Sequence, residues 1–164
     1  FLFSPAEVNA EIEQKAQDLA KLVVDKMEFI GILAVEMFLT KSGELLVNEV
    51  APRPHNSGHQ TIEGNVTSQF EQHLRSVLNL PLGSTAITQP SVMINLLGEK
   101  GYTGNAKYAG LEKIIARAGV NVHLYGKQIT KPYRKMGHIT VVANKMEAAK
   151  KLAHEVKKDI AVVS

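Results

Sequence analysis

The sequence predicts an α+β fold in two small domains, which we place at residues 1–87 and 88–164. Apolar residues recur at helical spacing near both ends of the chain, and this pattern predicts amphipathic helices. Between the helices lie short stretches with the two-residue alternation of antiparallel strands, and a tight turn joins one pair of them. Residues 84–90, which include Ser, Thr and Pro, resemble a linker at the expected boundary.

The first domain is expected to open with the end of a strand and then a helix. Phe1-Leu2-Phe3 is an apolar tripeptide typical of a strand whose partners lie elsewhere. Ser4 suits the N-cap of a helix, Pro5 its first position, and Glu7 the closing residue of a capping box. Apolar residues at helical spacing then predict a helix over residues 5–27: Val8, Ile12, Leu19, Val23 and Met27.

A hairpin and a second helix complete this domain. Residues 29–39 alternate in the manner of a strand, Lys-Ser-Gly-Glu at residues 41–44 indicates a turn, and residues 44–50 form the returning strand. The second helix is expected over residues 67–78, with an apolar face made of Phe70, Leu74, Val77 and Leu78.

The second domain combines short strands with two helices. A glycine-rich loop is expected at residues 98–110 and a basic loop at residues 126–137. The expected regular elements are strands at residues 92–97, 120–125 and 138–142, and helices at residues 111–118 (closed by Gly119) and 146–158.

Composition excludes several classes of function. The 164 residues have 45% hydrophobic content, enough for a packed core, and no apolar run approaches the roughly 18 residues that a membrane span needs. Cysteine is absent, which excludes thiolate metal sites and fits a reducing, cytoplasmic compartment. The net charge is only +3 and aromatic residues are 5%, so no nucleic-acid partner is expected. The basic loop, whose one aromatic residue is Tyr133, fits a single phosphate better.

Two glutamates, Glu36 and Glu49, are expected to face each other across the hairpin. With a two-residue turn at residues 42–43 they pair directly, whereas a three-residue turn without a bulge would put them on opposite faces. Two carboxylates about 5 Å apart repel by roughly 3 kcal/mol at an effective dielectric near 20, and a shared Mg²⁺ would relieve that repulsion. The alternative is that Glu36 simply faces solvent on the open side of the sheet.

The loop that follows, NEVAPRPHNSGHQ at residues 48–60, concentrates polar side chains on irregular backbone. Pro52 and Pro54 restrict the backbone around Arg53, which lowers the entropy cost of holding its guanidinium against a phosphate or carboxylate.

Two alternatives stand beside that interpretation of the loop. One is a rigid surface turn without a ligand. The other is a zinc site formed by His55 and His59, although Pro54 and Gly58 oppose a helix there and no cysteine is present to complete the ligand set.

Several stretches resemble the carboxyaminoimidazole ribonucleotide synthetases, a branch of the ATP-grasp family. They are GILAVEMF, LLVNEVAPRPHNSGHQTIEGNVTSQFEQHLR, NLPLG, HLYGK and KPYRKMGHIT, and the resemblance extends over essentially the whole chain. A related ATP-grasp enzyme, the formate-dependent glycinamide ribonucleotide transformylase, carries a similar E-x-x-PRPH run but typically an acidic residue where Asn56 stands. It is the alternative within the family.

The resemblance implies an ATP-dependent ligase of purine biosynthesis that carboxylates aminoimidazole ribonucleotide with bicarbonate, activated as carboxyphosphate. It assigns Mg²⁺ to Glu36 and Glu49, and the nucleotide ATP to Asn48 and Glu49. It gives Arg53 and His55 catalytic roles. The implied substrate ligands are Arg53, His55, Asn56, Ser57, Lys127 and Arg134. Tyr133 occupies a position where the family often has glycine.

For the fold, the resemblance implies the C-terminal part of an ATP-grasp domain, an antiparallel sheet with helices, over residues 1–87. A small mixed α/β, barrel-like domain follows over residues 88–164. Because an ATP-grasp enzyme needs a further subdomain that covers the nucleotide, the chain is expected to be an incomplete portion that is inactive alone. A homodimer is expected, with no membrane partner. A non-enzymatic binding or assembly module is the other functional class left open.

Overall fold

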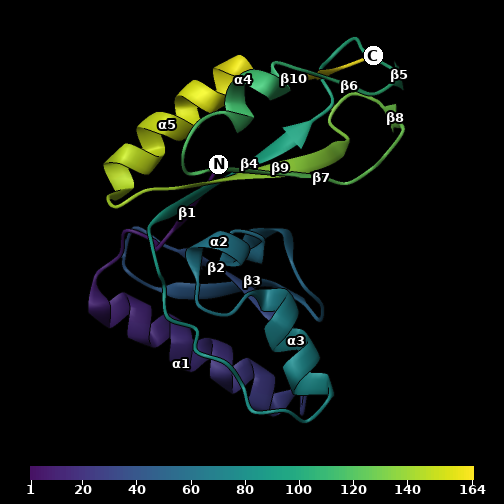
Figure 1. Cartoon of the computed structure of the whole chain (residues 1–164). Helices are drawn as coiled ribbons and strands as arrows, with labels where there is room; N and C mark the ends of the chain where they lie inside the picture. The colour runs from purple at the N-terminus through teal and green to yellow at the C-terminus, as the bar shows by residue number, and fades with distance from the viewer. The chain divides into compact units, whose positions relative to one another are not determined.

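The computed structural model describes all 164 residues, which divide into two compact units (Figure 1). Unit 1 comprises Phe1–Pro5, Glu63–Asn65 and Ile87–Ser164. Unit 2 comprises Ala6–Ile62 and Val66–Ala86. No helix is both long enough and apolar enough to span a membrane.

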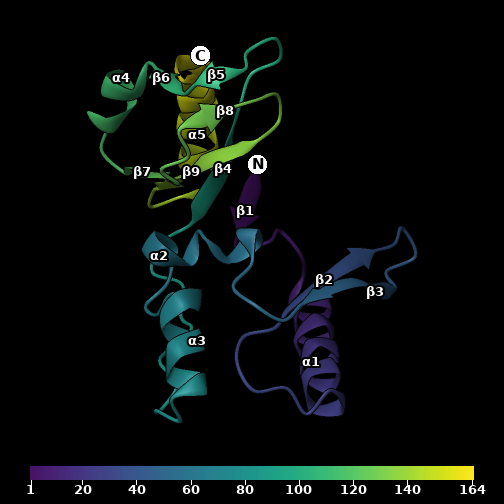
Figure 2. The same ribbon diagram turned by 90° about the vertical axis from the view of Figure 1, so that its right-hand side faces the viewer.

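Unit 2 consists of a β-hairpin with helices beside it, and Figure 2 shows α1 next to the β2–β3 hairpin. The two strands are antiparallel and form a sheet of their own. The helices and strands between residues 10 and 77 are α1 (Ala10–Lys26), β2 (Ala34–Leu39), β3 (Leu45–Ala51), the 3₁₀ turn η1 (Asn56–Gly58), the short helix α2 (Thr61–Gly64) and α3 (Gln69–Val77). The last residues of α2 belong to unit 1.

The first helix begins later than predicted. Ser4 does not cap it, because Ser4 lies in an extended strand and pairs with Ser91. The N-cap is Asn9, whose Oδ1 accepts a hydrogen bond from the backbone N–H of Ile12 at 2.8 Å. The prediction from Ser4 and Pro5 was therefore wrong, because strand pairing overrode a local capping signal. The strand expected at Phe1-Leu2-Phe3 is confirmed as Leu2–Ser4, but the expectation that its partners lie elsewhere was wrong, because it pairs with residues 91–93 of this chain.

The first hairpin strand is also shorter than predicted. Residues 29–33 are not a strand, because their backbone groups bond to α3 instead. The Gly31 N–H donates to Ser76 Oγ at 3.1 Å, and the Ile32 N–H donates to His73 Nδ1 at 3.3 Å. His73 therefore has a structural role in unit 2.

Few apolar side chains of unit 2 are buried. Ala51 is its one buried hydrophobic residue, whereas Phe38 and Leu78 are each more than half exposed. A two-stranded hairpin is marginally stable without further strands or helices packed on it. The hairpin and helices of unit 2 therefore leave a broad apolar surface uncovered.

Unit 1 is built on a four-stranded antiparallel sheet with the strand order β1-β4-β9-β7. Its strands are β1 (Leu2–Ser4), β4 (Ser91–Leu97), β7 (Val120–Leu124) and β9 (Lys135–Val142). The other elements are β5 (Gly104–Asn105), β6 (Lys107–Ala109), α4 (Leu111–Ile115), β8 (Ile129–Thr130), α5 (Met146–Asp159) and β10 (Ala161–Val163).

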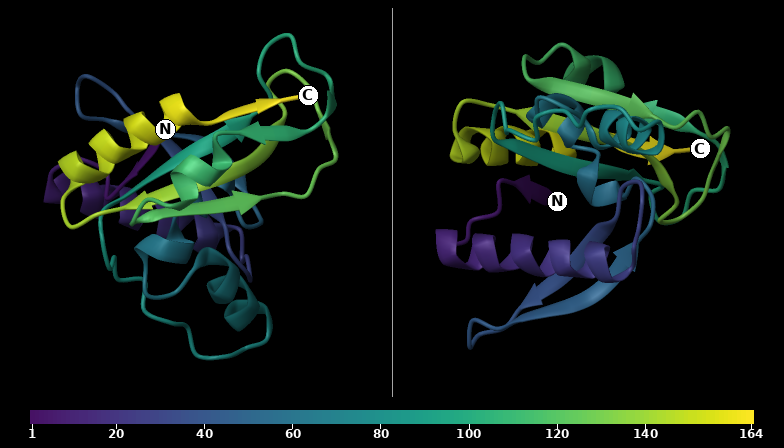
Figure 3. Two further views of the ribbon diagram at one scale, coloured as in Figure 1. Left: turned by 45° about the horizontal axis from the view of Figure 1, so that its top comes forward. Right: turned by 90° about the horizontal axis from the view of Figure 1, so that it is seen from below.

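The core of unit 1 lies between this sheet and α5, which runs along one face of the strands (Figure 3, left). Alternate strand residues such as Ile94, Ile139 and Val141 are almost fully buried there. They meet Ala149 and Ala153 of α5, whose small side chains let the helix approach closely. Both the strands and this helix agree with the sequence prediction.

The predicted α+β fold with antiparallel sheets and helices is confirmed, but the strands do not close into a barrel. The pairings form one open sheet and two-stranded ribbons, β10–β6 and β5–β8 in unit 1. A parallel bridge between Gly98 and Val162 connects the region after β4 to β10. Strands β5, β6, β8 and β10 were not predicted.

Candidate functional site

The hairpin places Glu36 directly opposite Glu49, as predicted. The turn length and the strand register that bring them together differ from the prediction. The turn has three residues rather than two, with the Thr40 N–H donating to the Glu44 carbonyl at 2.9 Å. Such a turn would put the two glutamates on opposite faces of a regular hairpin. A β-bulge between Glu36 and Met37 corrects this, because Asn48 is an extra residue on β3.

The two glutamates and His55 form a cluster that suits a divalent cation. One ligand atom from each residue lies within 4.8 Å of those of the other two. Glu36 Oε1 is 3.7 Å from His55 Nδ1, and Asn48 Nδ2 donates to Glu36 Oε2 at 3.4 Å. Carboxylate oxygens are the ligands that Mg²⁺ prefers, and two of them facing each other repel unless a cation lies between them. The carboxylate pair therefore fits Mg²⁺, and the imidazole of His55 lies beside it.

The following loop holds His55 beside that cluster. Ser57 Oγ lies 2.9 Å from His55 Nδ1, and the side chain of His55 also accepts from the Ser57 N–H as the N-cap of η1. The side chain of His55 is only 15% exposed, so its ring has little freedom to move. Asn56, another predicted substrate ligand, is the first residue of η1 and is half-buried.

Arg53 is exposed and lies outside the three-residue cluster. Its Nη1 donates to the Pro54 carbonyl at 3.1 Å, and its backbone N–H donates to the Ala51 carbonyl at 2.9 Å. The backbone of Arg53 is thus hydrogen-bonded within its own loop, and its side chain is exposed.

One residue of this site was missed by the sequence analysis. Gln69, the first residue of α3, is almost fully buried, and its carboxamide bonds to both backbone groups of His55. Its Oε1 accepts from the His55 N–H at 2.9 Å, and its Nε2 donates to the His55 carbonyl at 2.8 Å. No local pattern signals this contact, because the two residues are fourteen positions apart.

Lys127 and Arg134, the predicted phosphate ligands, belong to one loop of unit 1 between β7 and β9. Lys127 Nζ donates to the Lys135 carbonyl at 2.6 Å and lies 5.4 Å from the ring centre of Tyr125. Arg134 Nη1 donates to the Ile129 carbonyl at 2.7 Å. Both cations thus bond to the backbone of their own loop.

Two further residues of unit 1 lie in or next to this loop, Tyr133 within it and His138 in β9. Tyr133 has a left-handed backbone, with φ of 63°, which accounts for the glycine often found at this position in the resembled family. His138, which lies in β9 directly after this loop, is buried at 3% exposure. Its ring stacks on His123, whose Nε2 lies 2.6 Å from Glu63 Oε1. Burial also raises the pKa of Tyr125.

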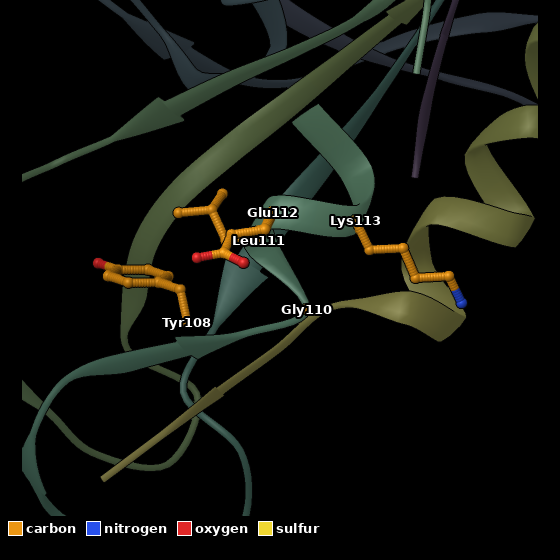
Figure 4. A pocket seen from close by; sticks show the side chains of 5 residues that line it. All are labelled: Tyr108, Gly110, Leu111, Glu112 and Lys113. Atoms are coloured by element: carbon orange, nitrogen blue, oxygen red, sulfur yellow. The ribbon is translucent and has the colours of Figure 1, made fainter. Parts of the chain in front are cut away.

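A separate pocket of about 480 Å³ lies in unit 1 beside α4 (Figure 4). Tyr108, Leu111 and Glu112 line it, but Lys113 extends toward α5 and bonds to Asp159 at 2.5 Å. That hydrogen bond, together with the charges of Lys113 and Arg117, lowers the pKa of Asp159. The pocket shares no residue with the predicted site.

Two domain families match this chain. Residues 1–70 match the family described as the ATP-grasp domain. Residues 91–152 match the family described as the phosphoribosylaminoimidazole carboxylase C-terminal domain. Together these matches cover most of the chain and leave residues 71–90 outside both.

Individual proteins that are similar to this chain are named as carboxyaminoimidazole ribonucleotide synthases or synthetases. A relative from Bacillus subtilis, named N5-carboxyaminoimidazole ribonucleotide synthase, is 51% identical over 136 residues, which are 83% of this chain and 34% of the relative. The crystal structure of N5-carboxyaminoimidazole ribonucleotide synthetase from Thermotoga maritima matches 99% of this chain and 45% of its own, with a TM-score of 0.96 and 54% identity.

The crystal structure of a third similar protein contains bound ligands. The Aspergillus clavatus N5-carboxyaminoimidazole synthase, in complex with ADP and 5-aminoimidazole ribonucleotide, has a TM-score of 0.86 and 39% identity. That match covers 95% of this chain and 42% of the other. This chain thus spans between about a third and a half of the length of these relatives.

Proposed function

We propose that this chain, which belongs to the ATP-grasp family in its branch of carboxyaminoimidazole ribonucleotide synthetases, contributes the metal-binding end of an ATP-dependent ligase site. The reaction proposed for the complete enzyme is the carboxylation of aminoimidazole ribonucleotide with bicarbonate, activated by ATP as carboxyphosphate, in purine biosynthesis. The names of the relatives support this substrate and product.

The observation that carries the proposal is the pairing of Glu36 with Glu49 beside His55. In the proposed site the two carboxylates hold Mg²⁺, and Asn48 and Glu49 contact the nucleotide. When bound, Mg²⁺ neutralises charge on the phosphoryl oxygens that are transferred. The Asn48 amide restrains the Glu36 carboxylate by its hydrogen bond, so that one carboxylate is oriented before a cation arrives.

The remaining roles follow from side-chain chemistry. The exposed guanidinium of Arg53 offers a planar pair of donors for the oxyanion of bicarbonate or phosphate, and His55 lies close enough to the carboxylates to orient a reacting group. Asn56 and Ser57 supply short polar contacts to the ribonucleotide. Lys127 and Arg134 are proposed to bind its phosphate; to do so they must exchange their backbone acceptors for phosphate oxygens, which is favourable for charged donors.

For the complete protein we propose a cytoplasmic homodimer with two functional parts in this chain, residues 1–87 and 88–164. The ATP-grasp part contributes the metal site and the small C-terminal part contributes the phosphate ligands. Because the relatives are more than twice as long, we expect the chain alone to show no turnover. Water exclusion from carboxyphosphate would then depend on residues outside it.

The experiment that tests the proposal transplants this chain into a longer relative. This chain replaces the matching segment of the Bacillus subtilis synthase, to which it is 51% identical, and ADP formation is measured with aminoimidazole ribonucleotide and bicarbonate. We expect turnover that requires both substrates. Glu36→Gln and Glu49→Gln should each lower kcat by about a hundredfold or more, since each removes a charge that holds the metal against the phosphates.

Glu44→Gln is the matched control, because Glu44 is an exposed glutamate at the turn of the same hairpin and lies outside the cluster. Its kcat should stay within about twofold of the unsubstituted chimera. Full activity in the Glu36 and Glu49 variants would overturn the proposed metal site. A folded chimera that hydrolyses ATP with formate and glycinamide ribonucleotide instead would favour the transformylase alternative.

A further inference from the structure

Gln69 links α3 to the loop that carries His55, and it does so through a two-bond clamp. Its Oε1 accepts from the His55 N–H at 2.9 Å and its Nε2 donates to the His55 carbonyl at 2.8 Å. The same Nε2 lies 2.8 Å from His59 Nδ1. The side chain is 6% exposed, so water cannot readily replace these bonds.

The surrounding loop is shaped to admit this side chain. A Cβ on Gly58 would lie 2.4 Å from Gln69 Oε1, so only glycine leaves room for the carboxamide. Thr61 Oγ1 accepts from the Gln69 N–H at 2.8 Å and donates to the Gly58 carbonyl at 2.6 Å. Gln69 is therefore bonded from both its backbone and its side chain to the segment that follows the prolines.

The clamp determines where the imidazole of His55 can lie. With both backbone groups of His55 fixed, its ring reaches Ser57 Oγ at 2.9 Å and approaches Glu36 Oε1 to 3.7 Å. Loss of the clamp would release the backbone on which this ring depends, although Gln69 itself touches neither glutamate in the three-residue cluster.

We propose that Gln69 is a positioning residue of the metal site, acting through His55. This inference rests on the proposed function, because it assumes that Glu36 and Glu49 bind a divalent cation. His55 lies one step removed from the proposed metal, where positioning groups typically change affinity by about 10–100-fold, and Gln69 acts one step further out. We expect an effect near the lower end, because the carboxylates stay in place on the hairpin.

The chain supplies its own matched control on the same helix. Gln72 clamps Gly83 in the same manner, with its Nε2 donating to the Gly83 carbonyl at 2.6 Å and its Oε1 accepting from the Gly83 N–H at 2.9 Å. Gly83 is not part of the candidate site. Gln69→Met and Gln72→Met therefore each remove such a pair of hydrogen bonds with the same change of side chain, and Gln69→Met also removes the contact with His59 Nδ1.

The experiment titrates Mn²⁺ into the 164-residue chain and its variants, with free Mn²⁺ followed by electron paramagnetic resonance. Both methionine variants should lose thermal stability, and Gln69→Met should lose more because it also gives up the contact with His59. Only Gln69→Met should bind Mn²⁺ about tenfold more weakly. In nuclear magnetic resonance spectra, Mn²⁺ should broaden the His55 ring signals in the wild type and in Gln72→Met, and less in Gln69→Met.

The outcomes separate this inference from the proposed function. If the wild type does not bind Mn²⁺, the metal site is wrong and this inference falls with it. If the wild type binds but Gln69→Met binds equally well, only the role of Gln69 is overturned. Should Gln69→Met fail to fold, Gln69→Glu keeps the acceptor for the His55 N–H and loses the donor. Unchanged Mn²⁺ affinity in that variant overturns the inference equally.

Discussion

Asn48 bulges out of the hairpin between Val47 and Glu49, and this single extra residue keeps Glu49 opposite Glu36. The three-residue turn shifts the strand register by one position, and the bulge shifts it back before the acidic pair is reached. Asn48 also donates its side-chain amide to Glu36. The same residue thus sets the geometry of the acidic pair and bonds to one of its members.

Replacing one glutamate of the acidic pair should have opposite effects on stability in the absence and in the presence of a bound metal ion. Without metal, Glu49→Gln should raise the free energy of unfolding of unit 2 by up to about 1 kcal/mol, because two like charges directly opposite each other are destabilising. With saturating Mn²⁺ the wild type should instead be more stable than Glu49→Gln, since only the wild type gains stability from the bound ion. Thermal unfolding with and without Mn²⁺ measures both effects.

Glu44→Gln again serves as the control for this comparison. It removes the same charge from the same hairpin and should respond to Mn²⁺ as the wild type does. Equal stabilisation of the wild type and Glu49→Gln by Mn²⁺ would place the ion elsewhere on the chain.

The left-handed backbone at Tyr133 should make this residue replaceable by glycine with a gain in stability. Its φ of 63° costs a residue with a Cβ about 1–2 kcal/mol, while its ring is 70% exposed and contributes little packing. After the entropy cost of glycine, Tyr133→Gly should stabilise unit 1 by about 0.5–1 kcal/mol in urea unfolding. Tyr102→Gly, at an exposed tyrosine without a positive φ, should be neutral or destabilising. A loss of stability in Tyr133→Gly would contradict the account of this loop.

Asp159 should make the stability of unit 1 sensitive to acid. Its hydrogen bond from Lys113, and the charges of Lys113 and Arg117, lower its pKa in the folded protein below the ordinary value of 3.8. A lowered folded-state pKa contributes stability that is fully present above the unfolded value and is lost as the pH falls through the folded one. Thermal unfolding between about pH 2 and pH 6 should therefore show a steeper acid loss in the wild type than in Asp159→Asn. Lys113→Met should flatten the profile only in part, because Arg117 still bonds to Asp159, and parallel profiles in all three proteins would exclude these ion pairs as the cause.

The sequence predicted best those features that local periodicity controls. Helix α5 and strand β4 begin and end within about one residue of their predicted bounds, because each is packed on one regular face. The very short strands β5, β8 and β10 carry no detectable alternation, and their pairing depends on distant segments. The helix start at Ser4 failed for the same reason, since its strand partner Ser91 is far away in sequence.

Within the site, the opposition of Glu36 and Glu49 was predictable, but the bulge that produces it was not. A turn of two residues and a turn of three residues with a bulge bring the same residues together, and the sequence does not distinguish them. The role of Gln69 could not be predicted from the sequence, for a different reason. Its contact with His55 exists only once α3 and the proline-bounded loop are folded against each other.

The most direct test of the central claim is an anomalous diffraction measurement on crystals of this chain soaked in Mn²⁺. If Glu36 and Glu49 share a divalent cation, one strong anomalous peak should lie between them, about 2.0–2.6 Å from a carboxylate oxygen of each, the range of hard cations with oxygen ligands. A map with bound Mn²⁺ elsewhere and no peak between these two side chains would contradict that claim.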